Sequence, residues 1–250
     1  MKIIGITGPI GHGKSTFSDA ILALEPLAVH LESSLIIAEV ANALHQSTIK
    51  LPDRDDLGAI NQWLKALPSI IEKVVHRAST FEQLQISIDA AERHPVEYEK
   101  LLLHLENLSR DPNLLAGTIN KDNKESYRPI LQWLGGYLVK NIDSGIWIKE
   151  LMRRAQIEAD KGSPVCIVGA LRYPTDAAIV REAGGVIVKI HRPGHLQYDL
   201  MDPTERERDD IKVDSTIDND GKLEDMARLA KRFLGDLYSD NIQASYRTSQ

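Results

Sequence analysis

A glycine-rich stretch near the start of the chain has the residue types and the spacing of a phosphate-binding loop. It has the pattern G-x-x-x-x-G-K-S and runs from Gly8 to Ser15. Glycines let backbone N–H groups converge on one point, and a helix that follows directs its N-terminus at the same point, which favours an anion. In this pattern the lysine reaches the β- and γ-phosphates, and the serine hydroxyl ligates Mg²⁺. The stretch therefore predicts binding of a nucleoside triphosphate with Mg²⁺.

The residues of this loop have different predicted roles. Lys14 is the candidate catalytic cation, and Ser15 is the candidate metal ligand. His12 can touch a phosphate, but the variable positions of the pattern accept many residue types, so we expect it to take no part in the chemistry. The residues predicted to bind the nucleotide here are Gly8, Gly11, His12, Gly13, Lys14, Ser15 and Thr16.

The segments around the loop predict the sheet that must position it. Residues 2–8 form a short β-branched run that ends in glycine, typical of a buried parallel strand, and residues 14–24 carry helical spacing. Further strands are predicted at 27–32, 163–170, 185–194 and 213–221, and further helices at 175–185 and 222–238. This alternation predicts a three-layer α/β/α fold of the P-loop NTPase type, with a parallel sheet and loops at the carboxyl ends of its strands.

A large helical insertion interrupts this alternation. From about residue 34 to residue 155 no convincing strand pair is present, and turn signals separate apolar segments with helical spacing. Helices are predicted within 59–75, 80–92, 96–108 and 145–159. At the other end of the chain, the polar tail from Ser239 is a candidate for disorder.

Composition argues against some classes of protein. The chain has 250 residues and a net charge of −6, whereas a nucleic-acid scaffold usually needs a basic face. No apolar run reaches the length of a membrane span, and no signal peptide precedes the glycine loop, so we expect a cytoplasmic protein without a membrane partner. The single cysteine, Cys166, falls in an apolar run and is expected to be a buried thiol.

Three stretches in the rest of the chain carry further patterns. Residues 127–147 fit R-x-x-L-Q-x-L-G-T-E-x-x-R-x-x-D-x-x-x-W at Arg128, Leu131, Gln132, Leu134, Gly135, Asp143 and Trp147. Residues 169–194 fit a strand that ends in D-V-R-F-P and continues to G-G and R-P-G, at Arg172, Pro174, Gly184, Gly185, Arg192, Pro193 and Gly194. Residues 202–226 fit D-x-x-I-x-N-D-G-x-L at Asp214, Ile217, Asn219, Asp220, Gly221 and Leu223. In this order, and together with the loop, the patterns resemble phage-type deoxynucleoside monophosphate kinases.

The resemblance implies transfer of the γ-phosphoryl group of ATP, with Mg²⁺, to a (deoxy)nucleoside 5′-monophosphate. Such a transfer gathers many anionic oxygens and needs several cations around the transferred group, a role that suits the bidentate guanidinium of arginine. Arg128 and Arg172 are predicted to hold the acceptor phosphate. Arg192, with Arg206 and Arg208, is predicted to belong to a lid that closes over ATP. The predicted catalytic residues are Lys14, Arg128, Arg172 and Arg192.

Three more residues are candidates for contacts with a nucleotide base. The amide of Gln132 can hydrogen-bond to a base edge. Trp147 can stack on a base, but its spacing with neighbouring apolar residues fits a helix core equally well. The resemblance places the turn at Asn219 near adenine, and a plain turn before the last helix is an equally good interpretation. His191 and His195 flank the R-P-G sequence, and without acids or cysteines at ligand spacing we expect no metal role for them.

One departure from the family pattern affects the chemistry. Ala170 stands where the family has an aspartate that would orient Mg²⁺ or its water, or position the acceptor. Three interpretations are open. Asp176 or Glu32 replaces the missing acid, or Ser15 and the phosphates hold Mg²⁺ without it, or the chain binds nucleotide and catalyses poorly.

These patterns predict a nucleotide-binding core in residues 1–40 and 126–250, with the lid around residues 192–212. Residues 41–125 are predicted to form a helical insertion on the acceptor side. Its apolar surface can be buried within the chain or against a second copy in a homodimer. Two other functions use the same core: a kinase for another phosphorylated small molecule, such as dephospho-coenzyme A, and a nucleotide-binding regulatory protein with weak or no catalysis. The base and the sugar of the acceptor are not specified by these patterns.

Overall fold

The structure is a computed structural model that describes residues 1–48, 50–76, 95–111, 114, 117–141, 143–195, 207–243, 245 and 246. By its contacts the chain forms two compact units, one of residues 1–33 and 151–250 and the other of residues 34–150. The predicted insertion, residues 41–125, lies inside the second unit, which also includes residues 126–150. The role of this insertion on the acceptor side stays a prediction.

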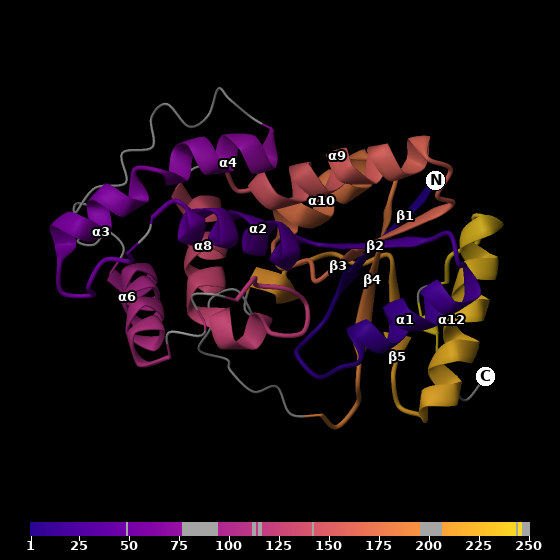
Figure 1. Cartoon of the computed structure of the whole chain (residues 1–250). Helices are drawn as coiled ribbons and strands as arrows, with labels where there is room; N and C mark the ends of the chain where they lie inside the picture. The colour runs from indigo at the N-terminus through magenta and orange to yellow at the C-terminus, as the bar shows by residue number, and fades with distance from the viewer. Residues whose placement is uncertain are drawn as a thin grey trace. The chain divides into compact units, whose positions relative to one another are not determined.

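A six-stranded parallel sheet forms the centre of the first unit (Figure 1), with the strand order β2-β3-β1-β4-β5-β6. The strands are β1 (Lys2–Thr7), β2 (Val29–Glu32), β3 (Val165–Gly169), β4 (Val186–His191), β5 (Ser215–Asp218) and β6 (Ser245–Tyr246). Because all strands run in the same direction, their carboxyl ends share one edge of the sheet. The predicted α/β fold with a parallel sheet is confirmed.

Helices cover both faces of this sheet. They are α1 (Lys14–Leu24), α10 (Pro174–Glu182), α12 (Leu223–Tyr238) and most of α9 (Ile146–Asp160). Ile4 and Ile6 of β1 belong to one core cluster with Phe17 of α1. Gly5 points the other way, since a Cβ there would lie 3.3 Å from Cγ1 of Val180 in α10. This alternation, in which successive residues face opposite sides, explains why residues 3–6 of β1 are all apolar.

The sixth strand is a correction to the sequence analysis. The tail from Ser239 is a candidate for disorder by composition, yet Ser245 and Tyr246 pair in parallel with β5. Tyr246 is fully buried, its ring packs edge-on against Phe233, and its hydroxyl donates to Asp236 at 2.9 Å. Burial of one aromatic ring with a satisfied hydroxyl outweighs the polar composition around it.

The second unit is helical, as predicted. Its elements are α2 (Ser33–Gln46), α3 (Leu57–Leu64), α4 (Leu67–Val75), α6 (Pro95–Arg110), the 3₁₀ helix η1 (Lys124–Tyr127), α8 (Arg128–Asn141) and the start of α9. The helix predicted within residues 80–92 lies outside the described residues. Over the described part of the whole chain, no helix combines the length and the apolarity that crossing a membrane requires.

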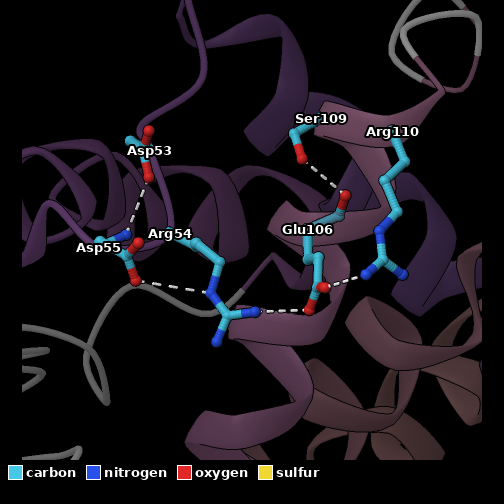
Figure 2. Close-up of polar contacts among 6 residues, drawn as sticks. All are labelled: Asp53, Arg54, Asp55, Glu106, Ser109 and Arg110. Carbon is cyan, nitrogen blue, oxygen red and sulfur yellow. Dashed lines mark hydrogen bonds and ion pairs between the residues drawn. The ribbon is translucent and has the colours of Figure 1, made fainter.

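A carboxylate shared by two arginines ties the loop before α3 to α6 (Figure 2). Glu106 accepts from Arg54 at 2.5 Å with one oxygen and from Arg110 with the other. Within the loop, Asp53 accepts the backbone N–H of Asp55 at 3.0 Å, which makes a tight turn. These side chains are partly exposed, so we expect the network to fix the path of the loop more than to stabilise the fold.

A buried pair of imidazoles joins α2 to α6. His45 and His104 are 5% and 1% exposed, and their Nε2 atoms lie 2.9 Å apart. The two rings are stacked, and the indole of Trp63 lies parallel to the ring of His45. Burial lowers the pKa of His45 to about 4 and that of His104 to about 3, the latter also because His45 is near. Both rings are therefore neutral at pH 7.

We predict that this pair makes the second unit sensitive to acid. Because the pKa values in the folded state are depressed, the stabilisation is complete above the unfolded value of 6.5 and is lost as pH falls towards 4. A shift of this size corresponds to about 3 kcal/mol for one imidazole. All three tryptophans lie within residues 34–150, so tryptophan fluorescence against pH reports this loss.

The double variant His45→Leu/His104→Leu provides the test of cause. It removes both titrating rings together, so no buried polar atom of the pair is left without its partner. We expect its acid midpoint to fall by at least half a pH unit, after a check by circular dichroism that it is folded at pH 7.5. An unchanged midpoint in a folded variant would mean that other groups cause the acid transition.

Candidate functional site

The phosphate loop leaves the carboxyl end of β1 in a conformation that requires glycine. Gly8, Gly11 and Gly13 have φ angles of 137°, 80° and 97°, a region that other residues rarely adopt. Space is equally restricted. A Cβ on Gly8 would lie 2.3 Å from the carbonyl oxygen of Ile190, and one on Gly13 would lie 2.5 Å from Nδ2 of Asn219. The glycines therefore serve both the turn of the loop and its close approach to β4 and β5.

The start of α1 is suited to bind an anion. Gly13 occupies the cap position, no side chain caps the helix, and its first turn contains no acidic residue. The ammonium of Lys14 donates to the carbonyl oxygens of Gly8 and Pro9 at 2.7 and 2.8 Å, which holds it over the loop. Ser15 follows with an exposed side chain. A cradle of glycine backbone with one lysine and one hydroxyl fits the triphosphate that the pattern predicts.

The residues also fit Mg²⁺ of the kind that binds with nucleotides. Among the described residues, no group of three or more His, Cys, Asp or Glu side chains could hold a metal ion. Mg²⁺ commonly keeps several waters and is held by few protein ligands together with phosphate oxygens. The hydroxyl of Ser15 is such a ligand, and this role stays a prediction.

Asn219 fastens the loop to the ends of the neighbouring strands. Its side-chain amide donates to the carbonyl oxygen of His12 at 2.9 Å, and its backbone N–H donates to the carbonyl oxygen of His191 at 2.6 Å. The amide of Asn219 is thus used to hold the loop. Its predicted contact with adenine stays a prediction.

His12 has a place in the loop that its variable position in the pattern does not indicate. Its ring is buried, and Nδ1 accepts the backbone N–H of Arg192 at 3.0 Å. Burial is the largest cause that lowers its pKa to about 4, followed by His195, His191, Lys14 and Arg208. The ring is therefore neutral at pH 7, which leaves the Nδ1 lone pair available as an acceptor.

Ala170 lies at the end of β3 in a left-handed conformation, with φ at 59°. The next residue is fixed to the end of β1: the N–H of Leu171 donates to Ile6, and its carbonyl oxygen accepts from the Thr7 hydroxyl at 3.1 Å. Arg172 follows with an exposed side chain, in a segment fastened to the strand that carries the phosphate loop. The predicted role of Arg172 with the acceptor phosphate stays a prediction.

Of the two candidate replacement acids, Asp176 already holds backbone. It accepts the N–H groups of Arg172 and Tyr173 at 3.0 and 3.1 Å, at the start of α10. Burial raises its pKa to about 6, although these hydrogen bonds and the charge of Arg172 act in the opposite direction. The carboxylate therefore supports the turn that carries Arg172.

Glu32 lies at the carboxyl end of β2, opposite Gly169 of β3 in the register of the sheet. A Cβ on Gly169 would lie 3.1 Å from Cγ of Glu32 and 2.5 Å from Nε2 of His30, so glycine makes the room that both side chains use. Oε1 of Glu32 lies 3.6 Å from Nε2 of His30. The acid is thus held next to the strand whose end carries Ala170.

The other predicted contacts lie in the second unit. Arg128 and Gln132 are four residues apart on α8, so both lie on one face of that helix. Arg128 is exposed and pairs with Glu125 at 3.0 Å. Trp147 is 5% exposed, and its indole N–H is 3.4 Å from the carbonyl oxygen of Gly135. This placement favours the core interpretation of Trp147, and its stacking on a base stays a prediction.

Two acids in the matched patterns have structural roles. Asp143 accepts the N–H of Gly145 and pairs with Lys149, at the start of α9. Asp214 lies just before β5, where its carboxylate accepts the N–H of Ile187 at 2.7 Å and pairs with Arg181. That end of the sheet is opposite to the phosphate loop. We therefore interpret these two matches to the family pattern as structural, because both acids bind backbone N–H groups and basic side chains near the ends of helices or strands.

The lid prediction falls only partly on described residues. Arg206 lies outside them, whereas Arg208 has a buried side chain and is one of the cations that lower the pKa of His12. Sequence reasoning missed the buried contacts of His12 with Arg192 and His195. The signal that could have indicated these contacts is the large imidazole of His12 in a loop that is otherwise rich in glycine, because a side chain of that size must pack against a neighbouring segment.

Comparison with known families supports these patterns. A family model described as deoxynucleotide monophosphate kinase matches residues 63–229, about two thirds of the chain. The match includes the three stretches at 127–147, 169–194 and 202–226 and begins after the glycine loop. A comparison with curated proteins finds no match.

We predict that the loop glycines are required for the fold as well as for binding. Gly8→Ala would place a methyl group against the backbone oxygen of Ile190, so we expect a loss of more than about 2 kcal/mol of unfolding free energy. Gly235→Ala is the matched control in the same unit. It is exposed on α12 with nothing within 4 Å of its Cβ, and we expect a gain of about 0.5–1 kcal/mol. Urea unfolding of both variants measures the difference, and equal effects would contradict it.

Proposed function

Because the chain belongs to the deoxynucleotide monophosphate kinase family, we propose that it is a P-loop kinase that transfers the γ-phosphoryl group of ATP to a (deoxy)nucleoside 5′-monophosphate. The products are ADP and the nucleoside diphosphate, and Mg²⁺ accompanies the ATP. The observation that supports this proposal best is the glycine loop at the N-terminus of α1, with Lys14 held over it.

The proposed transfer depends on charge and positioning. The phosphoryl group carries charge on three oxygens while it passes between two anions, so the protein must supply cations in fixed places. Lys14 and the N-terminus of α1 supply positive charge on the ATP side. Arg172, Arg192 and Arg128 are the cations proposed for the acceptor phosphate and the transferred group.

We propose that Glu32 takes the place of the missing aspartate. The carboxylate of Asp176 already accepts two backbone N–H groups. Glu32 lies at the carboxyl end of β2, and parallel α/β sheets bind their ligands at the carboxyl ends of the strands. Bound Mg²⁺ would be ligated by Ser15 and would supply neutralisation of phosphate charge. Glu32 would orient a water of its shell, a role that carboxylates around metal sites commonly fill.

The first prediction is activity with mononucleotides. We expect ADP formation from ATP and Mg²⁺ with one or a few members of a panel of ribo- and deoxyribonucleoside monophosphates. Lys14→Ala should reduce the rate by at least about a hundredfold, because it removes the cation at the β- and γ-phosphates. A coupled assay of ADP release measures both.

The panel also decides between the alternatives. Activity with dephospho-coenzyme A and with no mononucleotide would replace the proposed acceptor. Tight ATP binding without turnover of any acceptor would favour a nucleotide-binding regulatory protein and reject the kinase. Far-UV circular dichroism of Lys14→Ala must match that of the parent chain, so that its lost activity is not a loss of fold.

The second prediction concerns the acid. We expect Glu32→Gln to lower kcat and to weaken Mn²⁺ binding in the presence of a non-hydrolysable ATP analogue, each by roughly 10–100-fold. This is the usual effect of changing a residue that hydrogen-bonds to a ligand of a metal ion. Ala170→Asp in that background should restore both, because an aspartate accepts the left-handed backbone more readily than alanine does. Kinetics give the first quantity, and electron paramagnetic resonance of bound Mn²⁺ gives the second.

Asp176→Asn is the comparison for this prediction. It keeps an oxygen acceptor for the two N–H groups, so we expect Mn²⁺ binding close to that of the parent chain. If Glu32→Gln binds Mn²⁺ and turns over like the parent chain, Glu32 is not the replacing acid.

A further inference from the structure

The sequence R-P-G-H after β4 folds into a tight turn against the phosphate loop. The N–H of His195 donates to the carbonyl oxygen of Arg192 at 3.3 Å, and Gly194 between them has φ at 72°. Proline followed by glycine at a positive φ is typical of a type II turn. The ring of His195 then lies edge-on to the ring of His12, with the centroids 5.4 Å apart.

Both backbone polar groups of Arg192 are therefore held. Its N–H donates to Nδ1 of His12 at 3.0 Å, and its carbonyl oxygen closes the turn. Pro193 follows, and a residue before proline is restricted to extended conformations. Little freedom is left at the backbone of Arg192, whereas its side chain is exposed.

We propose that His12 is a positioning residue for ATP binding: its Nδ1 anchors the Arg192–His195 turn to the phosphate loop and so fixes the point from which the Arg192 guanidinium reaches the nucleotide. This inference rests on the proposed function, because it takes ATP as the ligand of the loop. It assigns a role to a variable position of the loop pattern.

Three observations support an anchor of this kind. His12 is itself fixed, since its carbonyl oxygen accepts from Asn219 and its ring is buried. Gly11 leaves room for the turn, because a Cβ there would lie 2.8 Å from Nε2 of His195. The depressed pKa of His12 keeps Nδ1 unprotonated at neutral pH, so the acceptor is present whenever the protein works.

The geometry of the ring suggests two matched variants. In His12→Asn the side-chain oxygen can occupy the place of Nδ1, so the anchor is kept. In His12→Gln the amide is one bond farther out, near the place of Nε2, so the anchor is lost although size and polarity are similar. His12→Ala removes the ring altogether.

The experiment measures the Kd of ATP by isothermal titration calorimetry and the Tm of each variant. We expect His12→Gln and His12→Ala to weaken ATP binding about tenfold, because the Arg192 guanidinium would no longer be held where it contacts the nucleotide. We expect the Kd of His12→Asn to stay within about threefold of that of the parent chain. Arg192→Ala should weaken binding to a similar degree. In the double variant His12→Gln/Arg192→Ala the two effects should not add, because both remove the same contact.

The outcomes separate positioning from a structural role. If His12→Gln and His12→Asn bind ATP equally well, or if the effects of His12→Gln and Arg192→Ala add in full, the proposal is overturned. The same holds if all His12 variants lower Tm and the loss of affinity follows Tm alone.

This experiment is also independent of turnover. The expected pattern of Kd values without phosphorylation of any mononucleotide would leave the anchor standing and reject the proposed acceptor. No ATP binding by the parent chain would reject both.

Discussion

The close approach of the phosphate loop to the strand beside it is the constraint on which the rest of the site depends. The carbonyl oxygen of Ile190 occupies the space that any side chain at position 8 would need. Only a backbone without a Cβ can pass there, and the same passage brings the loop within reach of Asn219 and of the start of the Arg192 turn. The order of the strands, with β1 between β3 and β4, is therefore part of the binding site.

Local patterns were sufficient where local physics decides. A β-branched strand, a glycine loop and a helix follow one another in the first 24 residues, and each is specified by its own side chains. The same holds for Cys166, which is buried in β3 as its apolar neighbours indicate. The fold class could thus be predicted without any long-range contact.

Long-range contacts decided the features that could not be predicted. Ser245 and Tyr246 form a strand because Tyr246 meets Phe233 and Asp236, which no pattern in the tail indicates. Trp147 has a spacing that suits a core and a chemistry that suits a base; its burial favours the core, and its stacking on a base stays a prediction. The contact of His12 joins residues 180 positions apart, and sequence spacing carries no information about such a pair.

The pair of His45 and His104 has one more consequence. A hydrogen bond between two Nε2 atoms requires a proton on one of them and none on the other, so two neutral rings of the same residue type must be different tautomers. Among the described residues neither Nδ1 atom has a hydrogen-bond partner that would favour one assignment. Exchange between the two arrangements needs two proton movements, one across the Nε2 pair and one from Nδ1 of one ring to Nδ1 of the other, because transfer of the shared proton alone would leave an imidazolium facing an imidazolate in a buried site. The core of the second unit therefore holds a fixed dipole whose direction is set by whichever ring donates.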